Sequence, residues 1–241
     1  MTNHQKLMAA ALAAAVVAAA GSAFAVGVGS ETASLSLELT FRSHFDDGLP
    51  EQDVFIEREP GMAQIYRPTK DDRDKSKPLF APIVPVRHSP FEPENVGPWT
   101  KGKPLGLTLG EWLAAEGQAT YRCADGRGRL VATFTNLVPN GVYTLRHTFL
   151  ASPPTDPVLG SYDLPLGARD GSEAIFRANA EGSAMVVRDF EPCLQLTGEQ
   201  LMSGLAIAWH SDGKSHGAHP GSFSTSTHVQ LYVELPKRSG I

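Results

Sequence analysis

The sequence predicts an all-β protein, an antiparallel β-sandwich of Greek-key or jelly-roll type with one or two short helices and a long proline-rich N-terminal segment. Two observations support this fold class. Residues 34–42, SLSLELTFR, alternate strictly between apolar and polar side chains, which is the period of a half-buried strand. From residue 107 onward, short apolar segments follow one another between turns rich in Gly, Pro and Asn, as in all-β domains.

The first 25 residues have the layout of a secretory signal peptide. Lys6 precedes an apolar run that ends at Ala20, and Ala23-Phe24-Ala25 forms a small-x-small cleavage site. The run is short and rich in alanine, and no later segment has the roughly eighteen continuous apolar residues of a membrane helix. We therefore expect a periplasmic or secreted protein without a membrane span.

Residues 26–106 are expected to pack on the core as one strand followed by irregular chain. The stretch 43–106 contains a charged run at 70–77 and then a segment crowded with prolines. Because proline removes a backbone donor and restricts the residue before it, this stretch predicts an extended cover or a long loop. A short strand at 54–57 is expected inside it.

Residues 107–236 are predicted to form the sandwich domain, with 237–241 as a tail. Asp125-Gly126 is the expected apex of a hairpin turn. Strands are expected at 118–123, 129–137, 142–150, 173–179, 183–190, 205–210 and 228–235.

Two capping-box patterns predict short helices. Thr108 and Glu111 have the spacing of an N-cap and its partner, with Gly117 as a stop. Thr197 and Gln200 have the same spacing and predict a second small helix just before strand 205–210.

The segment 209–228, which joins the last two predicted strands, holds four of the eight histidines: His210, His216, His219 and His228. The two strands are neighbours in sequence and are expected to pair as an antiparallel hairpin. Pairing His210 with His228 sets apolar residues opposite apolar residues along one face, whereas a slip of one residue sets them against polar ones. The pattern therefore predicts that His210 lies directly across from His228, with Cβ atoms roughly 5 Å apart.

Two imidazoles at that distance can share a transition-metal ion, because metal–nitrogen bonds are about 2.0–2.1 Å long. His216 and His219 are candidates for further ligands, with glycines beside them that let the loop fold back. His147 is a fifth candidate, since an apolar strand face keeps an imidazole neutral, although a satisfied core histidine has the same surroundings. All-nitrogen ligation and the general order of metal affinities favour copper ahead of zinc.

Cys123 and Cys193 are expected to form a disulfide, because pairing is the default for an even number of cysteines in an oxidising compartment. In the chain-entropy model such a bond stabilises the fold by roughly 4 kcal/mol. The chain has no CxxC spacing, which argues against thiolate ligation of a metal.

Charge and motifs disfavour several classes of protein. Without Lys6 the 21 Lys plus Arg become 20, against 26 Asp plus Glu, so the exported chain has a net charge of −6 and no nucleic-acid signature. There is no GxSxG elbow, HExxH helix or phosphate-binding loop, and Asp212-Gly213 is interpreted as a turn. We do not predict an enzyme, although an open coordination position would permit redox catalysis.

The segment NLVPNGVYTLRH, 136–147, resembles the turn-into-strand segments of secreted sandwich domains such as the copper-zinc superoxide dismutases and their non-enzymatic relatives. The resemblance covers a dozen residues and implies architecture. Leu145 stands where the His-x-His pair of that enzyme family would have a second histidine relative to His147, so dismutation does not carry over.

Together these features predict an exported metal-binding protein that acts as a carrier, buffer or sensor, with a metal ion and another exported protein as its partners. A structural or adhesive module without metal is the alternative, binding protein or glycan through exposed aromatics at Trp99, Trp112 and Tyr162. Proton sensing by the same histidines is a third possibility.

Overall fold

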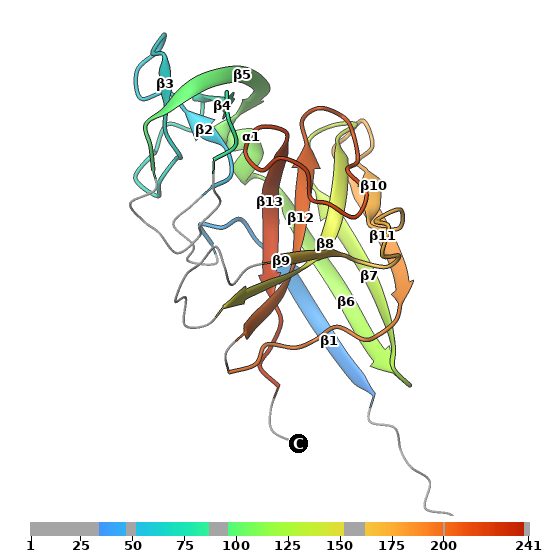
Figure 1. Cartoon of the computed structure of the whole chain (residues 1–241). Coiled ribbons are helices and arrows are strands. Elements are labelled where there is room, and N and C mark those ends of the chain that lie inside the picture. The colour runs from blue at the N-terminus through green and yellow to red at the C-terminus, as the bar shows by residue number, and fades with distance from the viewer. Residues whose placement is uncertain (1–33, 47–51, 87–95, 152–161, 200, 239–241) are drawn as a thin grey trace, which may run out of the picture. The chain divides into compact units, whose positions relative to one another are not determined.

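The computed structural model describes residues 34–46, 52–86, 96–151, 162–199 and 201–238, so the predicted signal peptide lies outside it. Within these ranges the chain forms three antiparallel sheets and one short helix, which confirms the all-β class (Figure 1). No helix of this described part is long and apolar enough to cross a membrane.

The first sheet has the strand order β1-β6-β7-β11. Its strands are β1 (Leu35–Phe41), β6 (Glu116–Ala124), β7 (Arg127–Thr135) and β11 (Ala184–Phe190), which agree with the predicted segments. The hairpin between β6 and β7 turns at Asp125 and Gly126, whose φ angles are 51° and 77°. Positive φ at both central residues is the requirement of a tight type I′ turn, so the predicted apex is confirmed.

The second sheet has the order β10-β8-β12-β13. A further strand, β9, pairs with residues 146–149 of β8, next to the part of β8 that pairs with β10. Its strands are β8 (Val142–Ala151), β9 (Tyr162–Pro165), β10 (Ile175–Arg177), β12 (Leu201–His210) and β13 (Thr227–Glu234). Apart from β9, all of them correspond to predicted strands. The last two form the expected antiparallel hairpin, and almost every residue of both is buried.

The first and second sheets share one apolar core. Residues of the first sheet such as Phe41 and Phe134 belong to the same buried cluster as Leu145 and Ile207 of the second. At one side the sheets are joined by a backbone bridge, in which Arg42 and Tyr232 exchange two N–H···O bonds of 2.9 Å. This shared core meets the main requirement of a sandwich, while the Greek-key or jelly-roll connection stays a prediction.

A third sheet forms within the proline-rich stretch, where we expected an irregular cover. It has the order β2-β4-β5-β3, with β2 (Phe55–Ile56), β3 (Gln64–Ile65), β4 (Pro78–Pro82) and β5 (Trp99–Thr108). The short strand expected at 54–57 is confirmed as β2. The β4–β5 ladder is irregular on either side of Phe80, between Pro78 and Pro82, because proline cannot donate a ladder bond. Prolines therefore interrupt the pairing without preventing it.

Of the two predicted helices only the first is present. In α1 (Leu109–Leu113) the Thr108 side chain accepts from the Glu111 backbone and the Glu111 carboxylate accepts from the Thr108 backbone, so the capping box is confirmed. The predicted helix after Thr197 is wrong, because β12 already begins at Leu201. The Thr197 hydroxyl instead donates to the Leu235 carbonyl at 2.7 Å and accepts from the Ser203 amide at 3.0 Å.

The aspartate Asp53 attaches the N-terminal segment to the last hairpin. Its buried carboxylate accepts hydrogen bonds from the Ser224 hydroxyl at 2.7 Å and the Val229 amide at 3.1 Å. Arg67, also buried, lies 3.5 Å from the same carboxylate. Burial raises the pKa of Asp53 to about 6, so it is still ionised at neutral pH beside the guanidinium.

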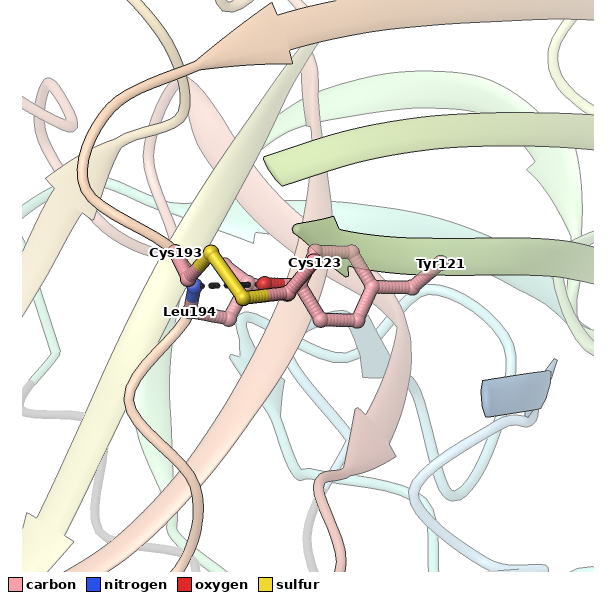
Figure 2. Close-up of a disulfide and its surroundings, with 4 residues drawn as sticks. All are labelled: Tyr121, Cys123, Cys193 and Leu194. Carbon is pink, nitrogen blue, oxygen red and sulfur yellow. Dashed lines mark hydrogen bonds between the residues drawn. A yellow bond between two sulfur atoms is a disulfide. The ribbon is translucent and has the colours of Figure 1, made fainter. Parts of the chain in front are cut away.

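The predicted disulfide between Cys123 and Cys193 is present (Figure 2). It connects the end of β6 to the segment that follows β11. The Leu194 amide donates to the Tyr121 hydroxyl at 2.8 Å beside it, and the Cys193 amide donates to the Gly126 carbonyl at 3.1 Å. The bond and these two contacts fix the position of the 193–194 backbone against the first sheet.

Candidate metal centre

The histidine-rich loop folds back over one face of the β12–β13 hairpin. We call this the loop face: it carries His210, Ala208 and Ala206 of β12, and Phe223 from the loop packs on it. The Arg146 guanidinium of β8, in the same row as Ala206, donates to the Ala218 carbonyl of the loop at 2.8 Å. The opposite face of the hairpin, which we call the core face, carries Trp209 and lines the shared core.

Three potential ligands meet where β12 ends: His210, Asp212 and His216. Each offers one ligand atom, and these atoms all lie within 4.8 Å of one another. Nε2 of His216 is 3.4 Å from a carboxylate oxygen of Asp212, and the rings of His210 and His216 have centroids 5.2 Å apart. Two imidazoles and one carboxylate at this spacing fit a transition-metal ion with an open coordination position.

Burial keeps the inner ligand neutral. His210 is 1% exposed, and burial, followed by the neighbouring His216, lowers the pKa of the His210 imidazole to about 4. Asp212 acts in the opposite direction and raises that pKa, without overcoming the effect of burial. At neutral pH His210 is therefore in the neutral form, with one unprotonated ring nitrogen, and this is the form of histidine that binds metals.

Two threonine hydroxyls define the tautomer of His210. Thr227 donates its only hydroxyl hydrogen to the Pro220 carbonyl at 2.8 Å, so the same oxygen must accept from Nδ1 of His210, 3.3 Å away. Nε2 then accepts from the Thr144 hydroxyl at 3.0 Å. A metal ion would replace one of these contacts, and the other threonine would orient the ring through its remaining N–H, as hydrogen-bond acceptors around metal sites do.

The loop reaches the cluster because glycine is present at Gly221. Its φ is +88°, and a Cβ atom there would lie 2.5 Å from the Thr227 hydroxyl oxygen and 2.6 Å from Cδ2 of His216. Both distances are shorter than any real contact, so only glycine lets the chain pass this close. Asp212 is held locally, since its carboxylate accepts from the Lys214 amide at 3.0 Å in the predicted turn.

The predicted pairing of His210 with His228 is wrong. Pairs up to Ile207–Leu231 follow the expected register, but a bulge then places Trp209 opposite His228 and His210 opposite Thr227. Gln230 is the inserted residue: its amide accepts from the Tyr143 hydroxyl at 2.8 Å and donates to the Trp112 carbonyl at 3.1 Å. The bulge allows Gln230 to form these buried hydrogen bonds. It also places His210 on the loop face of the hairpin and His228 on the core face.

His228 consequently lies on the core face, away from the cluster. Its Nδ1 donates to the Asp53 carbonyl at 2.9 Å, and its Nε2 contacts the Ser211 hydroxyl at 3.0 Å. Burial lowers the pKa of His228 to about 4. Both ring nitrogens are thus engaged by the protein, and the arrangement is that of a satisfied core histidine.

The other two candidate ligands also lie outside the cluster. His219 is exposed, and its backbone amide closes a turn onto the His216 carbonyl at 3.3 Å. His147 projects from the core face of β8, where its ring packs on Phe149 with centroids 4.2 Å apart. The structure therefore brings together two of the five proposed ligands, His210 and His216.

Asp212 is not among the ligands predicted from the sequence, because Asp-Gly after a strand is typical of a turn. The residue does form that turn, and its other carboxylate oxygen approaches His216. The available signal was the spacing of the three residues, two and four positions apart, across a tight turn that reverses the chain.

The aromatic residues of the adhesive alternative have different environments. Trp112 is 1% exposed, so the expectation that it is an exposed contact residue is wrong. It lies on α1, whose apolar side faces the core, and its indole N–H donates to the Gln52 side chain at 3.1 Å. Trp99 is half-buried and packs on Phe55, and the Tyr162 side chain lies outside the described residues.

No family model matches the chain, and no curated protein matches its sequence. The resemblance of residues 136–147 to secreted sandwich domains thus rests on that short segment alone.

Proposed function

We propose that this protein is exported and binds a divalent transition-metal ion through His210, Asp212 and His216, as a carrier, buffer or sensor on a β-sandwich. The observation that supports the proposal is the approach of three potential ligand atoms to within 4.8 Å, with the buried imidazole held neutral. The disulfide fits the proposed location, since such bonds persist in oxidising compartments.

The donor set narrows the choice of metal. Two imidazoles and a carboxylate are ligands of intermediate hardness, which suit Cu(II) and Zn(II) better than Cu(I). The general affinity order keeps Cu(II) ahead of Zn(II) at such a site. Because a two-histidine, one-carboxylate set also holds Fe(II) in other proteins, Fe(II) belongs in the test.

The test is a calorimetric titration of the purified exported protein with Cu(II), Zn(II) and, without oxygen, Fe(II). One equivalent of metal is expected to bind, and the melting temperature should rise, because a ligand that binds only the folded state stabilises it. The spectrum of the Cu(II) complex by electron paramagnetic resonance should show coupling to nitrogen.

Three variants make the test specific. His216→Ala and Asp212→Asn each change one of the proposed ligands. His216 is partly exposed and Asp212 is exposed, so both variants should still fold. Each variant should bind the metal at least about tenfold more weakly than the native protein. His219→Ala is the matched control, since it removes an exposed imidazole of the same loop. A protein that binds no metal, or whose affinity falls equally in all three variants, would contradict the proposal.

A further inference from the structure

A cavity lies on the core side of β8, on the opposite face of that strand from Thr144 and the metal-centre residues. Its volume is about 510 Å³, within the range of roughly 300–1,000 Å³ typical of small-molecule sites. The walls come from β8, from β9 and the chain after it, and from the end of β11 and the segment that follows it. Its lining includes the side chains of His147, Phe149, Leu164, Leu166, Phe190 and Leu194.

The walls of the cavity are mainly apolar. Phe149, Leu166 and Leu194 are buried, and Phe190 is partly buried and stacks on Tyr121. Leu164 is 49% exposed at the rim, one of only a few large apolar side chains in the described part of the chain that are so open to water. An apolar molecule in the cavity would cover this surface and gain free energy from its burial.

The cavity is preformed, because both of its sides are fixed. On one side the disulfide and the hydrogen bond from the Leu194 amide to the Tyr121 hydroxyl hold the 193–194 backbone. On the other side the Leu166 amide donates to the Leu145 carbonyl at 3.1 Å. A ligand would therefore not have to order the walls, which reduces the entropy cost of binding.

Hydrogen-bond counting shows which nitrogen of His147 is free to accept. The Ser203 hydroxyl is 2.5 Å from the Gln195 carbonyl, which can only accept, so serine donates its single hydrogen there. The serine oxygen must then accept from Nε2 of His147, 2.8 Å away. Nδ1 keeps a lone pair, and no described residue donates a hydrogen bond to it. Burial lowers the pKa of His147 to about 4, so this lone pair persists at neutral pH.

The charged residues of the wall favour a neutral ligand. Arg169 and Glu191 both line the cavity and both are exposed, so they contribute one charge of each sign. Glu191 is already paired with Arg127. The cavity thus offers apolar surface and a neutral acceptor, and its two charged side chains lie in the exposed part of the wall.

We propose that this cavity binds a small neutral apolar molecule that carries one hydrogen-bond donor, such as a phenol or an alcohol, with the donor directed to Nδ1 of His147. The site is independent of the proposed metal centre, because the two share no residue.

The test compares two probes of similar shape, 1-naphthol and 1-methoxynaphthalene, by calorimetry on the complete exported protein. Only 1-naphthol can donate to His147, so it should bind about tenfold more tightly. His147→Leu should remove that difference by weakening 1-naphthol alone. Leu164→Glu, on the rim, should weaken both probes, whereas Met185→Glu, at another exposed apolar residue outside the cavity lining, should weaken neither.

Two results would overturn the inference. One is equal affinity of the native protein for the two probes, or no binding of either at concentrations up to about 1 mM. The other is 1-naphthol binding that His147→Leu or Leu164→Glu leaves unchanged, which would place the probe elsewhere. Asp212→Asn should not alter 1-naphthol binding, so failure of the metal proposal and failure of this one are distinguishable.

Discussion

The imidazole of His228 packs against the indole of Trp209, with ring centroids 5.4 Å apart, at the loop end of the β12–β13 hairpin. This contact places His228 in the core, with its Nδ1 bonded to the Asp53 carbonyl and its Nε2 to the Ser211 hydroxyl. The histidine connects the N-terminal segment, the core and the turn after β12, and its role is structural.

His228→Ala should lower the free energy of unfolding by about 3 kcal/mol, because it opens a cavity and leaves the buried Asp53 carbonyl without its donor. Urea denaturation followed by tryptophan fluorescence measures the change. His219→Ala, in the exposed part of the loop, should alter stability by less than about 0.5 kcal/mol. If the two variants were equally stable, the core position of His228 would be wrong.

Gly221→Ala should weaken metal binding at least about tenfold, because the new Cβ would collide with the Thr227 hydroxyl and the His216 ring. Gly213→Ala is the matched control: its φ of +71° is also unfavourable for alanine, but no atom lies within 4 Å of the added carbon. The control should lose about 1 kcal/mol of stability and keep its metal affinity. Calorimetric titration with Cu(II) measures both variants, and equal losses of affinity would exclude a specific effect at Gly221.

Removal of the disulfide by Cys123→Ala together with Cys193→Ala should cost about 4 kcal/mol of stability, because the bond closes a loop with a sequence separation of 70 residues. Chemical denaturation of the native protein with and without reductant should give a similar difference. The double variant should be insensitive to the reductant, and a native protein equally insensitive to it would argue against the bond.

Acidification should destabilise the protein between pH 6.5 and about pH 4. Burial depresses the pKa values of His147 and His228 to about 4, so the unfolded chain binds protons in this window and the folded chain does not. The contribution of these neutral histidines to the free energy of unfolding is therefore fully present above pH 6.5 and is lost as the pH falls towards 4. For the fully buried His228 this loss is on the order of 3 kcal/mol. Asp53, with its pKa raised to about 6, has the opposite sign and offsets about 2 kcal/mol.

Urea denaturation at pH 7.5, 5.5 and 4.5 in the presence of a chelator measures this dependence. His147→Gln, which cannot titrate, should reduce the loss of stability between pH 6.5 and 4.5. Stability that rises on acidification would show that Asp53 outweighs the histidines.

Much of the fold follows from local patterns that the sequence contains. The alternation in β1, the capping box at Thr108 and the Asp125-Gly126 turn each depend on neighbouring residues, and all three were predictable. The strands of the third sheet were missed except β2, because the prolines predicted a loop, whereas these strands form by backbone pairing between segments that are distant in the sequence.

The sequence alone therefore determined most strands of the first two sheets, the hairpin of the last two strands, the cysteine pair and the concentration of histidines after β12. Only the tertiary structure decided which histidines meet. Gln230 inserts as a bulge because its amide bonds to Tyr143 and Trp112, which are 87 and 118 positions away in the chain. The alternation of apolar and polar residues along a strand does not reveal hydrogen-bond partners that are distant in the sequence. The bulge that these bonds stabilise turns His228 into the core, and His210 lies with Asp212 and His216 instead.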